Sequence, residues 1–369
     1  MPMNLRSLDA LRGLLATYIV LGHSRWLLWA GHSAWLKHSH TNWEIPIAYG
    51  SAILRYGHEA VIVFFALSGF FIHLRAARLL TTSAAAQTDA LRFYRRRAHR
   101  LVAPYALALG FTIILDVVGR HYYPTLYSAT TGDSLLDWNF SRSGYSAAAI
   151  APALLLLPSS LEKDFGTNSP LWALAFEVIY YLLYPAWLII RRKGPLMAYG
   201  VTALACVALT LLPYRNFFTS VVTSYPVWLG GAALAEFLTR VPGLRINPLV
   251  AGGVFLAAFA AKFLIPIPAF SILLSAPFGS ACVLAFAAMP ESVSVRRWHR
   301  FLEAIGIRSY TIYITHFPIL VLISAWAFDV FGGRPLSGWL AVGGTLITIG
   351  LSWLCFEVCE RRFLHRPVA

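Results

Sequence analysis

The chain has 369 residues, of which 58% are hydrophobic and only 12% are charged, and its mean hydropathy is +0.64. Because soluble domains carry about 25% charged residues, this composition excludes an ordinary soluble protein and is typical of a membrane protein. The formal charge of +14 does not indicate a nucleic-acid partner, since the basic residues are scattered between apolar runs and are not gathered on one polar domain.

The first apolar stretch begins near residue 5 and reads LRSLDALRGLLATYIVLGHSRWLLWAG. Its apolar run is too long for a signal peptide and no small-residue cleavage site follows it, so we expect it to remain in the protein as a helix. Within this stretch, eleven residues separate Arg12 from His23. Eleven residues make about three helical turns, which places both side chains on one face, about 16 Å apart along the axis.

Each of these two residues also has a simple structural interpretation. Arg12 would anchor the helix at the cytoplasmic boundary, and His23 would form a hydrogen bond between helices. An ionisable side chain near the middle of a membrane must nevertheless face protein or water. His23 is therefore a candidate functional residue as well.

Ten apolar stretches are long enough to cross a hydrocarbon core of about 30 Å, which needs about 20 residues. They lie near residues 9–30, 57–77, 101–119, 170–190, 196–213, 221–239, 248–265, 269–289, 309–328 and 337–357. We therefore expect an all-α integral membrane protein with about ten transmembrane helices. A further apolar run at 147–158 is too short to cross comfortably, and it predicts a re-entrant segment within 120–169.

The distribution of basic residues predicts how these helices are oriented. If 120–169 is re-entrant, most of the 30 lysines and arginines lie on the same side as both chain ends. If the run at 147–158 crossed instead, the basic cluster at 191–193 and everything after it would change sides. The positive-inside rule therefore favours cytoplasmic termini and a periplasmic 120–169 segment. We expect one transmembrane domain over residues 1–369, without a fused soluble domain.

Further polar side chains lie deep in the predicted spans. Glu177 falls about 10 Å into the fourth span from the outer side, and His316 lies at a similar depth from the inner side. Ser68 is in the middle of the second span. Two histidines and a glutamate at this depth are costly unless they share a hydrated cavity. There, a neutral histidine is a good general base and a glutamate can orient it.

The four cysteines indicate neither a disulfide framework nor a metal site. Cys206, Cys282, Cys355 and Cys359 all fall inside apolar runs, and no CxxC spacing occurs. The last two share a helical face, but no histidine or aspartate nearby has a spacing that would complete a metal site. We predict that no metal is bound and that the cysteines are packing residues.

Several motifs in order along the chain resemble those of the family-3 membrane acyltransferases. They are LDALRG with its Arg-x10-His spacing, FFALSGFFI, FYRRRAHRLVAPY, SPLWALAFEVIYYLLYP, the YxxYxxH that contains Tyr313 and His316, and a late ERRF. Members of this bacterial family move acyl groups, usually acetyl, from coenzyme A to sugars and other hydroxyl acceptors. The resemblance therefore implies acetyl-CoA, or another acyl-CoA, as the donor.

The resemblance also implies roles for individual residues. Arg12 and His23 match the family's paired positions in the first helix. Glu177 matches the acid after the LWxL motif, although the usual second acidic residue is Val178 here, which leaves Glu177 fewer proton partners. We take His23, Arg12 and Glu177 as the predicted catalytic residues. Further candidates are Ser68, Tyr313 and His316.

An arginine-rich stretch after the second span is the predicted donor site. Arg97 and Arg100 match the family's Arg-x-x-Arg, and Arg96 lies beside them. Acyl-CoA is cytoplasmic and polyanionic, and its phosphates suit bidentate arginine contacts better than lysines. The alternative is an ordinary positive loop that only sets topology. With a donor bound, its pantetheine arm would lie along the face of the first helix that carries Arg12 and His23.

These observations predict an O-acyltransferase of the bacterial inner membrane that acylates an exopolysaccharide or a lipopolysaccharide O-antigen sugar. Outer-loop aromatics fit either a carbohydrate platform or an interfacial belt; they are Trp35, Trp43, Tyr122, Tyr123 and Trp138. A small natural product such as a macrolide is the alternative acceptor.

The alternative hypothesis, from another functional class, is a proton-coupled transporter or flippase in which His23, His316 and Glu177 form a proton relay. The absence of an internal sequence repeat argues against it. If the chain is an acyltransferase, we expect His23 and Glu177 to lie side by side in one polar passage that also touches Arg12.

Overall fold

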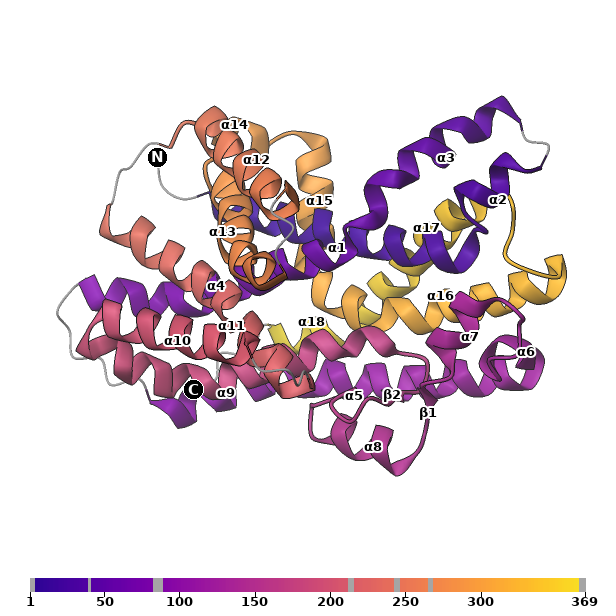
Figure 1. Cartoon of the computed structure of the whole chain (residues 1–369), viewed down its shortest axis with the longest axis horizontal. Helices are drawn as coiled ribbons and strands as arrows, with labels where there is room; N and C mark the ends of the chain where they lie inside the picture. The colour runs from indigo at the N-terminus through magenta and orange to yellow at the C-terminus, as the bar shows by residue number, and fades with distance from the viewer. Residues whose placement is uncertain are drawn as a thin grey trace. The chain divides into compact units, whose positions relative to one another are not determined.

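The computed structural model describes residues 4–38, 41–81, 89–211, 216–241, 246–264 and 268–364, and these are almost entirely helical (Figure 1). The longer helices are α1 (Leu5–Leu28), α4 (Gly57–Thr81), α5 (Ala90–Tyr122), α9 (Trp172–Lys193), α10 (Pro195–Thr210), α11 (Phe217–Arg240), α12 (Pro248–Leu264), α13 (Pro268–Ala287), α16 (Ser309–Phe331) and α17 (Trp339–Cys355). Each apolar stretch predicted from the sequence falls on one of these helices.

Shorter elements connect the long helices. They are α2 (His32–Leu36), η1 (Asn42–Glu44), α3 (Ile45–Gly50), η2 (Ser51–Arg55), α6 (Pro124–Tyr127), α7 (Ser134–Phe140), α8 (Ala147–Leu154), η3 (Ser169–Leu171), α14 (Glu291–Ser294), α15 (Arg297–Ile307) and α18 (Arg361–Leu364). A π-helical turn, η4 (Phe356–Glu360), continues α17.

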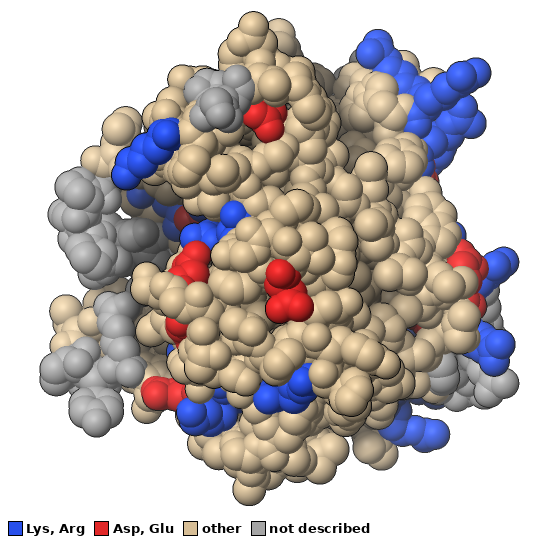
Figure 2. All heavy atoms as spheres, turned by 90° about the vertical axis from the view of Figure 1, so that its right-hand side faces the viewer, with Lys and Arg blue, Asp and Glu red and all other residues tan. Residues whose placement is uncertain are grey.

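Within the described residues, six helical segments are long and apolar enough to cross a membrane. These segments are Gly57–Leu80, Ala90–Tyr122, Ser169–Lys193, Phe217–Arg240, Ser309–Phe331 and Trp339–Glu360. Shorter apolar helices cover Pro195–Thr210, Pro248–Leu264 and Leu274–Ala287. On the face drawn in Figure 2 most of the surface comes from uncharged residues, which suits contact with lipid. The chain is a multi-pass membrane protein.

The segment 120–169 departs from the all-α prediction. It contains a small parallel sheet, in which β1 (Ser143–Gly144) pairs with β2 (Asp164–Phe165). The apolar run at 147–158 forms the eight-residue helix α8 and an irregular end. At 1.5 Å per residue, α8 is about 12 Å long and cannot cross a bilayer.

The chain divides into two compact units, each described here by itself. The first unit contains the described parts of residues 1–15, 58–94 and 176–307. The second unit contains the described parts of residues 16–57, 95–175 and 308–369.

In the first unit, α4 and α11 approach each other through glycines. A Cβ atom added at Gly69 would lie 1.8 Å from the carbonyl oxygen of Trp228, and one at Gly231 would lie 1.8 Å from that of Ala66. Small residues are the usual means of close helix contact in membranes, where packing rather than hydrophobic burial drives association. The short separation also brings the Trp228 side chain to Ser68 of α4.

In the second unit, buried hydroxyl groups join α1, α16 and α17. Thr315 donates to Ser352 at 2.8 Å, and Thr345 donates to Ser24 at 2.9 Å. The hydroxyl of Ser324 donates to the carbonyl oxygen of Leu27 at 2.9 Å. These bonds satisfy polar side chains where water is absent, and they fix the faces that α1 and α16 present to each other.

We expect Gly231→Ala to lower the thermal midpoint of the detergent-solubilised protein, because its new methyl group would overlap the α4 backbone. Overpacking of this kind costs about 1–3 kcal/mol. Gly253→Ala in α12 is the matched control, since nothing lies within 4 Å of its added Cβ. The control should be neutral or slightly stabilising, as alanine is the better helix former. Equal midpoints for the two variants would contradict the close contact.

Candidate active site

The second unit brings together two candidate residues, His23 of α1 and His316 of α16, which we call the histidine pair. Their ring centroids lie 5.3 Å apart, with an angle of 41° between the planes. His316 is fully buried, and His23 is half-buried. The ring of Phe317 packs edge-on against both, with centroid distances of 5.0 Å and 6.1 Å. Two intramembrane imidazoles therefore share one apolar-walled site.

Trp26 determines which nitrogen of His23 carries the proton. Its indole Nε1–H donates to Nδ1 of His23 at 3.1 Å. An indole can only donate, so Nδ1 must accept, and the neutral ring then carries its proton on Nε2. Sequence reasoning missed Trp26, although its spacing of three residues from His23 would place it on the same helical face.

The backbone of α16 determines the opposite arrangement for His316. Nδ1 of His316 lies 2.7 Å from the carbonyl oxygen of Tyr313 and 3.1 Å from that of Ile312. Carbonyl oxygens only accept, so Nδ1 carries the proton and Nε2 has a free lone pair. This Nε2 atom is buried and has no hydrogen-bond partner among the described residues.

A proline in α16 gives Asn168 a structural role beside the histidine pair. In a regular helix the carbonyl of Ile314 would accept from the N–H of residue 318, but that residue is Pro318, which has none. The Asn168 amide donates to this freed carbonyl at 2.9 Å and to Thr112 of α5 at 3.0 Å. Asn168 therefore ties α5 to α16 within two residues of His316. The sequence offered no signal for it beyond Pro318 itself.

Asp116 of α5 holds the segment that carries Asn168. Its buried carboxylate accepts from the Thr167 N–H at 2.9 Å, from the Thr167 hydroxyl at 2.6 Å and from Tyr145 at 2.8 Å. The adjacent Gly166 has φ of 55°, and a Cβ there would lie 2.4 Å from the Asp116 carboxylate. Glycine is thus required for the carboxylate to approach this turn.

Tyr313, a further candidate from the sequence, contacts both the histidine pair and η3. Its ring lies 5.8 Å from that of His316, centroid to centroid. Its hydroxyl donates to the carbonyl oxygen of Pro170 at 2.8 Å. This bond makes Tyr313 a second link between α16 and the segment that follows β2.

In the first unit, two other candidates, Ser68 and Glu177, lie in direct contact. The Ser68 hydroxyl donates to the Glu177 carboxylate. Tyr181, one turn further along α9, donates to the same Oε1 atom at 2.5 Å, and Trp228 donates to Ser68 at 3.3 Å. We call these four residues the Ser68–Glu177 group; the sequence predicted two of its members and missed the two aromatic ones.

Arg12, also in the first unit, forms an ion pair within its own helix. Its Nη1 donates to Asp9 of the LDALRG motif at 2.8 Å, and its guanidinium lies 4.1 Å from the ring centroid of Phe71. The partnership with Asp9 was not foreseen from the sequence. His23 and Glu177 belong to different units, so the expected polar passage joining them stays a prediction.

The arginine-rich stretch is helical rather than a loop, because α5 begins at Ala90. A helix of 33 residues is about 50 Å long, which exceeds the hydrocarbon core by about 20 Å. Arg96 and Arg97 are half-buried on α5, and Arg100 is exposed. Arg100 interacts electrostatically with Glu360, the buried end of the π-helical turn, which accepts a hydrogen bond from Thr311.

A second buried ionic group in the first unit is fully satisfied. Glu236 accepts from Arg191 in a bidentate manner. It also contacts His73 at 3.0 Å and Arg240 at 2.9 Å. The other ring nitrogen of His73 lies 2.9 Å from the Tyr184 hydroxyl. Because every partner is present, this group stabilises the packing of α4, α9 and α11.

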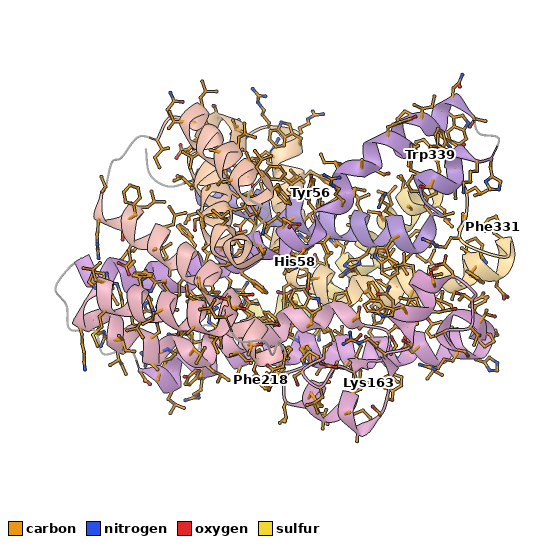
Figure 3. The ribbon with its side chains drawn as sticks, in the orientation of Figure 1. Tyr56, His58, Lys163, Phe218, Phe331 and Trp339 are labelled. Carbon is orange, nitrogen blue, oxygen red and sulfur yellow. The ribbon has the colours of Figure 1, made fainter. Side chains whose placement is uncertain are left out.

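The aromatic residues expected on the outer loops differ in exposure. Trp43 is 60% exposed and stacks on Trp339, with ring centroids 5.2 Å apart; Trp339 is labelled in Figure 3. Trp138 is also exposed, whereas Trp35 is buried and donates to Glu44 at 3.4 Å. Of the outer-loop aromatics, Trp35 is therefore not available to an exposed carbohydrate platform. Hydrogen bonds from Ser337 and Thr41 lower the pKa of Glu44.

The acyltransferase-3 family model, described as an acyltransferase domain, matches residues 5–357. The chain therefore belongs to the acyltransferase-3 family of membrane acyltransferases, as the motifs in the sequence indicated. No solved structure matches the chain.

Two curated relatives show the range of this family. The chain is 25% identical over 345 residues to the peptidoglycan O-acetyltransferase OatA of Listeria monocytogenes, an alignment that covers 85% of this chain and 51% of that protein. It is 27% identical over 305 residues to the acyltransferase MdmB of Streptomyces mycarofaciens, covering 73% of this chain and 71% of that protein. The chain thus spans about half the length of the Listeria relative.

We expect Asn168→Ala to lower the thermal midpoint, because it leaves the Ile314 carbonyl without its donor in the bundle. A buried polar group without a partner costs about 1–3 kcal/mol. Asn139→Ala is the control, since Asn139 is half-buried and its solvent-exposed amide bond runs within α7, to the carbonyl oxygen of Leu135. A midpoint for Asn168→Ala within 1 °C of the wild type, on the order of the error of such a comparison, would show that the bond contributes little.

Proposed function

We propose that this protein is an O-acyltransferase that moves an acyl group, acetyl by preference, from cytoplasmic acyl-CoA to a hydroxyl group of an envelope or exported polysaccharide. The observation that carries the proposal is the histidine pair, in which one buried imidazole nitrogen keeps an unused lone pair. Acyl transfer from a thioester to a hydroxyl needs such a base, and no metal or redox cofactor enters the reaction. Family membership supports the same chemistry.

The proposed topology places both termini in the cytoplasm and the 120–169 segment in the periplasm of a bacterial inner membrane. It is supported by ten helices at the predicted positions and by the positive-inside distribution of arginine and lysine. The shortest of these helices, α10, has 16 residues and a length of about 24 Å. Local bilayer thinning accommodates a span of this length.

The donor's phosphates are assigned to Arg96, Arg97 and Arg100, and Arg12 of α1 is kept as a separate candidate for donor binding. Arg96 and Arg97 have two features that suit a phosphate site, since they are half-buried and follow one another on a helix that extends past the hydrocarbon core. Glu177, with Ser68 as its hydrogen-bond donor in the first unit, is kept as a candidate catalytic residue.

Two classes of molecule are candidates for the acyl acceptor, and each is supported by one of the two similar proteins. A polysaccharide hydroxyl agrees with the peptidoglycan O-acetyltransferase, and a small natural product agrees with the Streptomyces acyltransferase. Exposed Trp43 and Trp339 support the first, because stacked indoles bind sugar rings. Purified protein in lipid nanodiscs, given radiolabelled acetyl-CoA with either an envelope polysaccharide or a macrolide, separates the two. Substrate uptake without release of coenzyme A would favour a transporter instead.

We expect His23→Ala to lower acyl transfer at least about 100-fold, since it removes one of the two imidazoles proposed to act at the reacting centre, where a base or an oxyanion donor is worth about 10² or more in rate. Transfer is measured with radiolabelled acetyl-CoA, and folding is checked by gel filtration in detergent. The exposed His38→Ala is the control and should transfer at the wild-type rate. Near-normal transfer by His23→Ala would refute the assignment of the histidine pair.

We expect the double variant Arg97→Ala, Arg100→Ala to raise the KM for acetyl-CoA at least about tenfold, with a smaller change in kcat. The reason is that each charge-assisted hydrogen bond is worth about 1.5–3 kcal/mol. Arg142→Ala with Lys163→Ala removes the same charge from the 120–169 segment and should leave the KM unchanged. An unaltered KM in the first variant would reduce these arginines to topology determinants.

A further inference from the structure

The two rings of the histidine pair are held in opposite tautomers. Trp26 occupies the Nδ1 lone pair of His23, which leaves an N–H at Nε2. The Nδ1–H of His316 donates to the carbonyl oxygens of Tyr313 and Ile312, so the Nε2 atom of that ring keeps its lone pair. One ring therefore offers a hydrogen-bond donor and the other an acceptor, within a centroid distance of 5.3 Å.

The Nε2 atom of His316, the acceptor without a partner, indicates what kind of group the site binds. Buried polar atoms in native proteins nearly always have partners, so an orphaned one points to a missing group. His316 is 0% exposed, and its Nε2 atom has no hydrogen-bond partner in the part of the chain that the structure describes. The missing partner must be a donor, and the hydroxyl group of an acyl acceptor is a donor. A group that only accepts, such as a thioester carbonyl, cannot fill this position.

We propose that His316 is the general base of acyl transfer and that His23 donates a hydrogen bond to the carbonyl oxygen of the thioester. This division of roles rests on the function proposed above and extends it. Base and donor then come from different helices, α16 and α1. Their tautomers are set by groups outside the substrate, so they are in place before it binds.

The proposed step balances as follows. The acceptor hydroxyl gives its proton to Nε2 of His316 while its oxygen bonds to the acyl carbon. The carbonyl oxygen becomes an oxyanion that accepts from the Nε2–H of His23. The carbon–sulfur bond then breaks, and His316 returns the proton to the sulfur of the leaving coenzyme A. The products are an O-acyl ester and a free thiol, with no oxidant, reductant or further reactant.

The surroundings of each ring fit this division. Asn168 and Tyr313 tie α16 to η3 and α5 beside His316, so the base is held on a fixed helix. His23 is half-buried and can meet an incoming substrate from one side. If His23 were the base, its Nε2 would have to lose a proton that the Trp26 bond keeps there, and the bond to Trp26 would have to break first.

Matched glutamine variants test the division of roles. A glutamine at 316 can accept a hydrogen bond but cannot take up a proton, so His316→Gln should lower kcat about 10²–10⁴-fold and leave the KM for acetyl-CoA within about twofold. A glutamine at 23 still offers an N–H, so His23→Gln should retain at least about ten times the activity of His23→Ala, because an oxyanion donor is worth about 10²–10³ in rate. His121→Gln replaces an exposed histidine by glutamine in the same way; it is the control variant and should keep the wild-type rate.

The opposite result would reverse the roles. If His23 is the base, His23→Gln and His23→Ala will be equally inactive, and His316→Gln will retain most of its kcat. A His316→Gln variant that loses activity together with its thermal midpoint would indicate a structural role only, and it would overturn the proposal.

Nitrogen-15 NMR of histidine-labelled protein in lipid bilayers tests the tautomers without any substrate. We expect the His316 resonances to show a protonated Nδ1 and a bare Nε2, and those of His23 to show the reverse; the glutamine variants supply the assignments. Trp26→Phe should let His23 populate both tautomers. A protonated Nε2 on His316 in the wild type would overturn the proposal. If the wild type does not transfer acyl groups at all, the proposed function fails, and the NMR result shows separately whether the tautomers were assigned correctly.

Discussion

The hydrogen bond from Asn168 to the carbonyl of Ile314 is the interaction on which the proposed site depends. A membrane interior supplies no water, so every backbone group freed from a helix must find its partner in the protein. Pro318 frees one carbonyl of α16, and Asn168 satisfies it while also bonding to Thr112 of α5. This bond fixes the height of α16 relative to α5, and with it the position of His316 two residues further on.

The same requirement distinguishes structural polar groups from functional ones. Glu236 has four protein partners for its carboxylate, counting Tyr199 at 3.3 Å with Arg191, His73 and Arg240, and nothing about it calls for a ligand. In contrast, the Nε2 atom of His316 is equally buried and lacks a partner among the described residues. An unsatisfied lone pair in a dry interior costs free energy, and together with the neighbouring imidazole of His23 it makes His316 the stronger candidate for contact with a substrate.

The sequence predicted the helices well and the partners of the site poorly, for a physical reason. The bilayer sets the length of an apolar helix, so a run of about 20 apolar residues is sufficient evidence for one. The hydrogen bonds between different helices of the bundle have no comparable pattern in the sequence. His23 and His316 were visible as ionisable residues at depth, yet Asn168 and Trp228 looked like ordinary polar and aromatic residues until their partners were known. The burial of Trp35 beside Glu44 likewise had no signal in the sequence.

The spacing of Arg12 and His23 belongs to a different kind of constraint, because both lie on one unbroken helix, α1. Eleven residues of regular helix set their separation along the axis at about 16 Å whatever the rest of the chain does. Acyl-CoA is an extended molecule with phosphates at one end and a thioester at the other. Its binding requires protein groups held at a fixed distance from each other. On α1, Asp9 holds the Arg12 guanidinium and Trp26 holds the His23 ring; under the proposed function these two would meet the phosphate and thioester ends of the donor. A regular helix fixes this distance without a loop that would have to become ordered on binding. Under the proposed function, α1 alone would therefore carry both a residue for donor binding and a residue that polarises the carbonyl group.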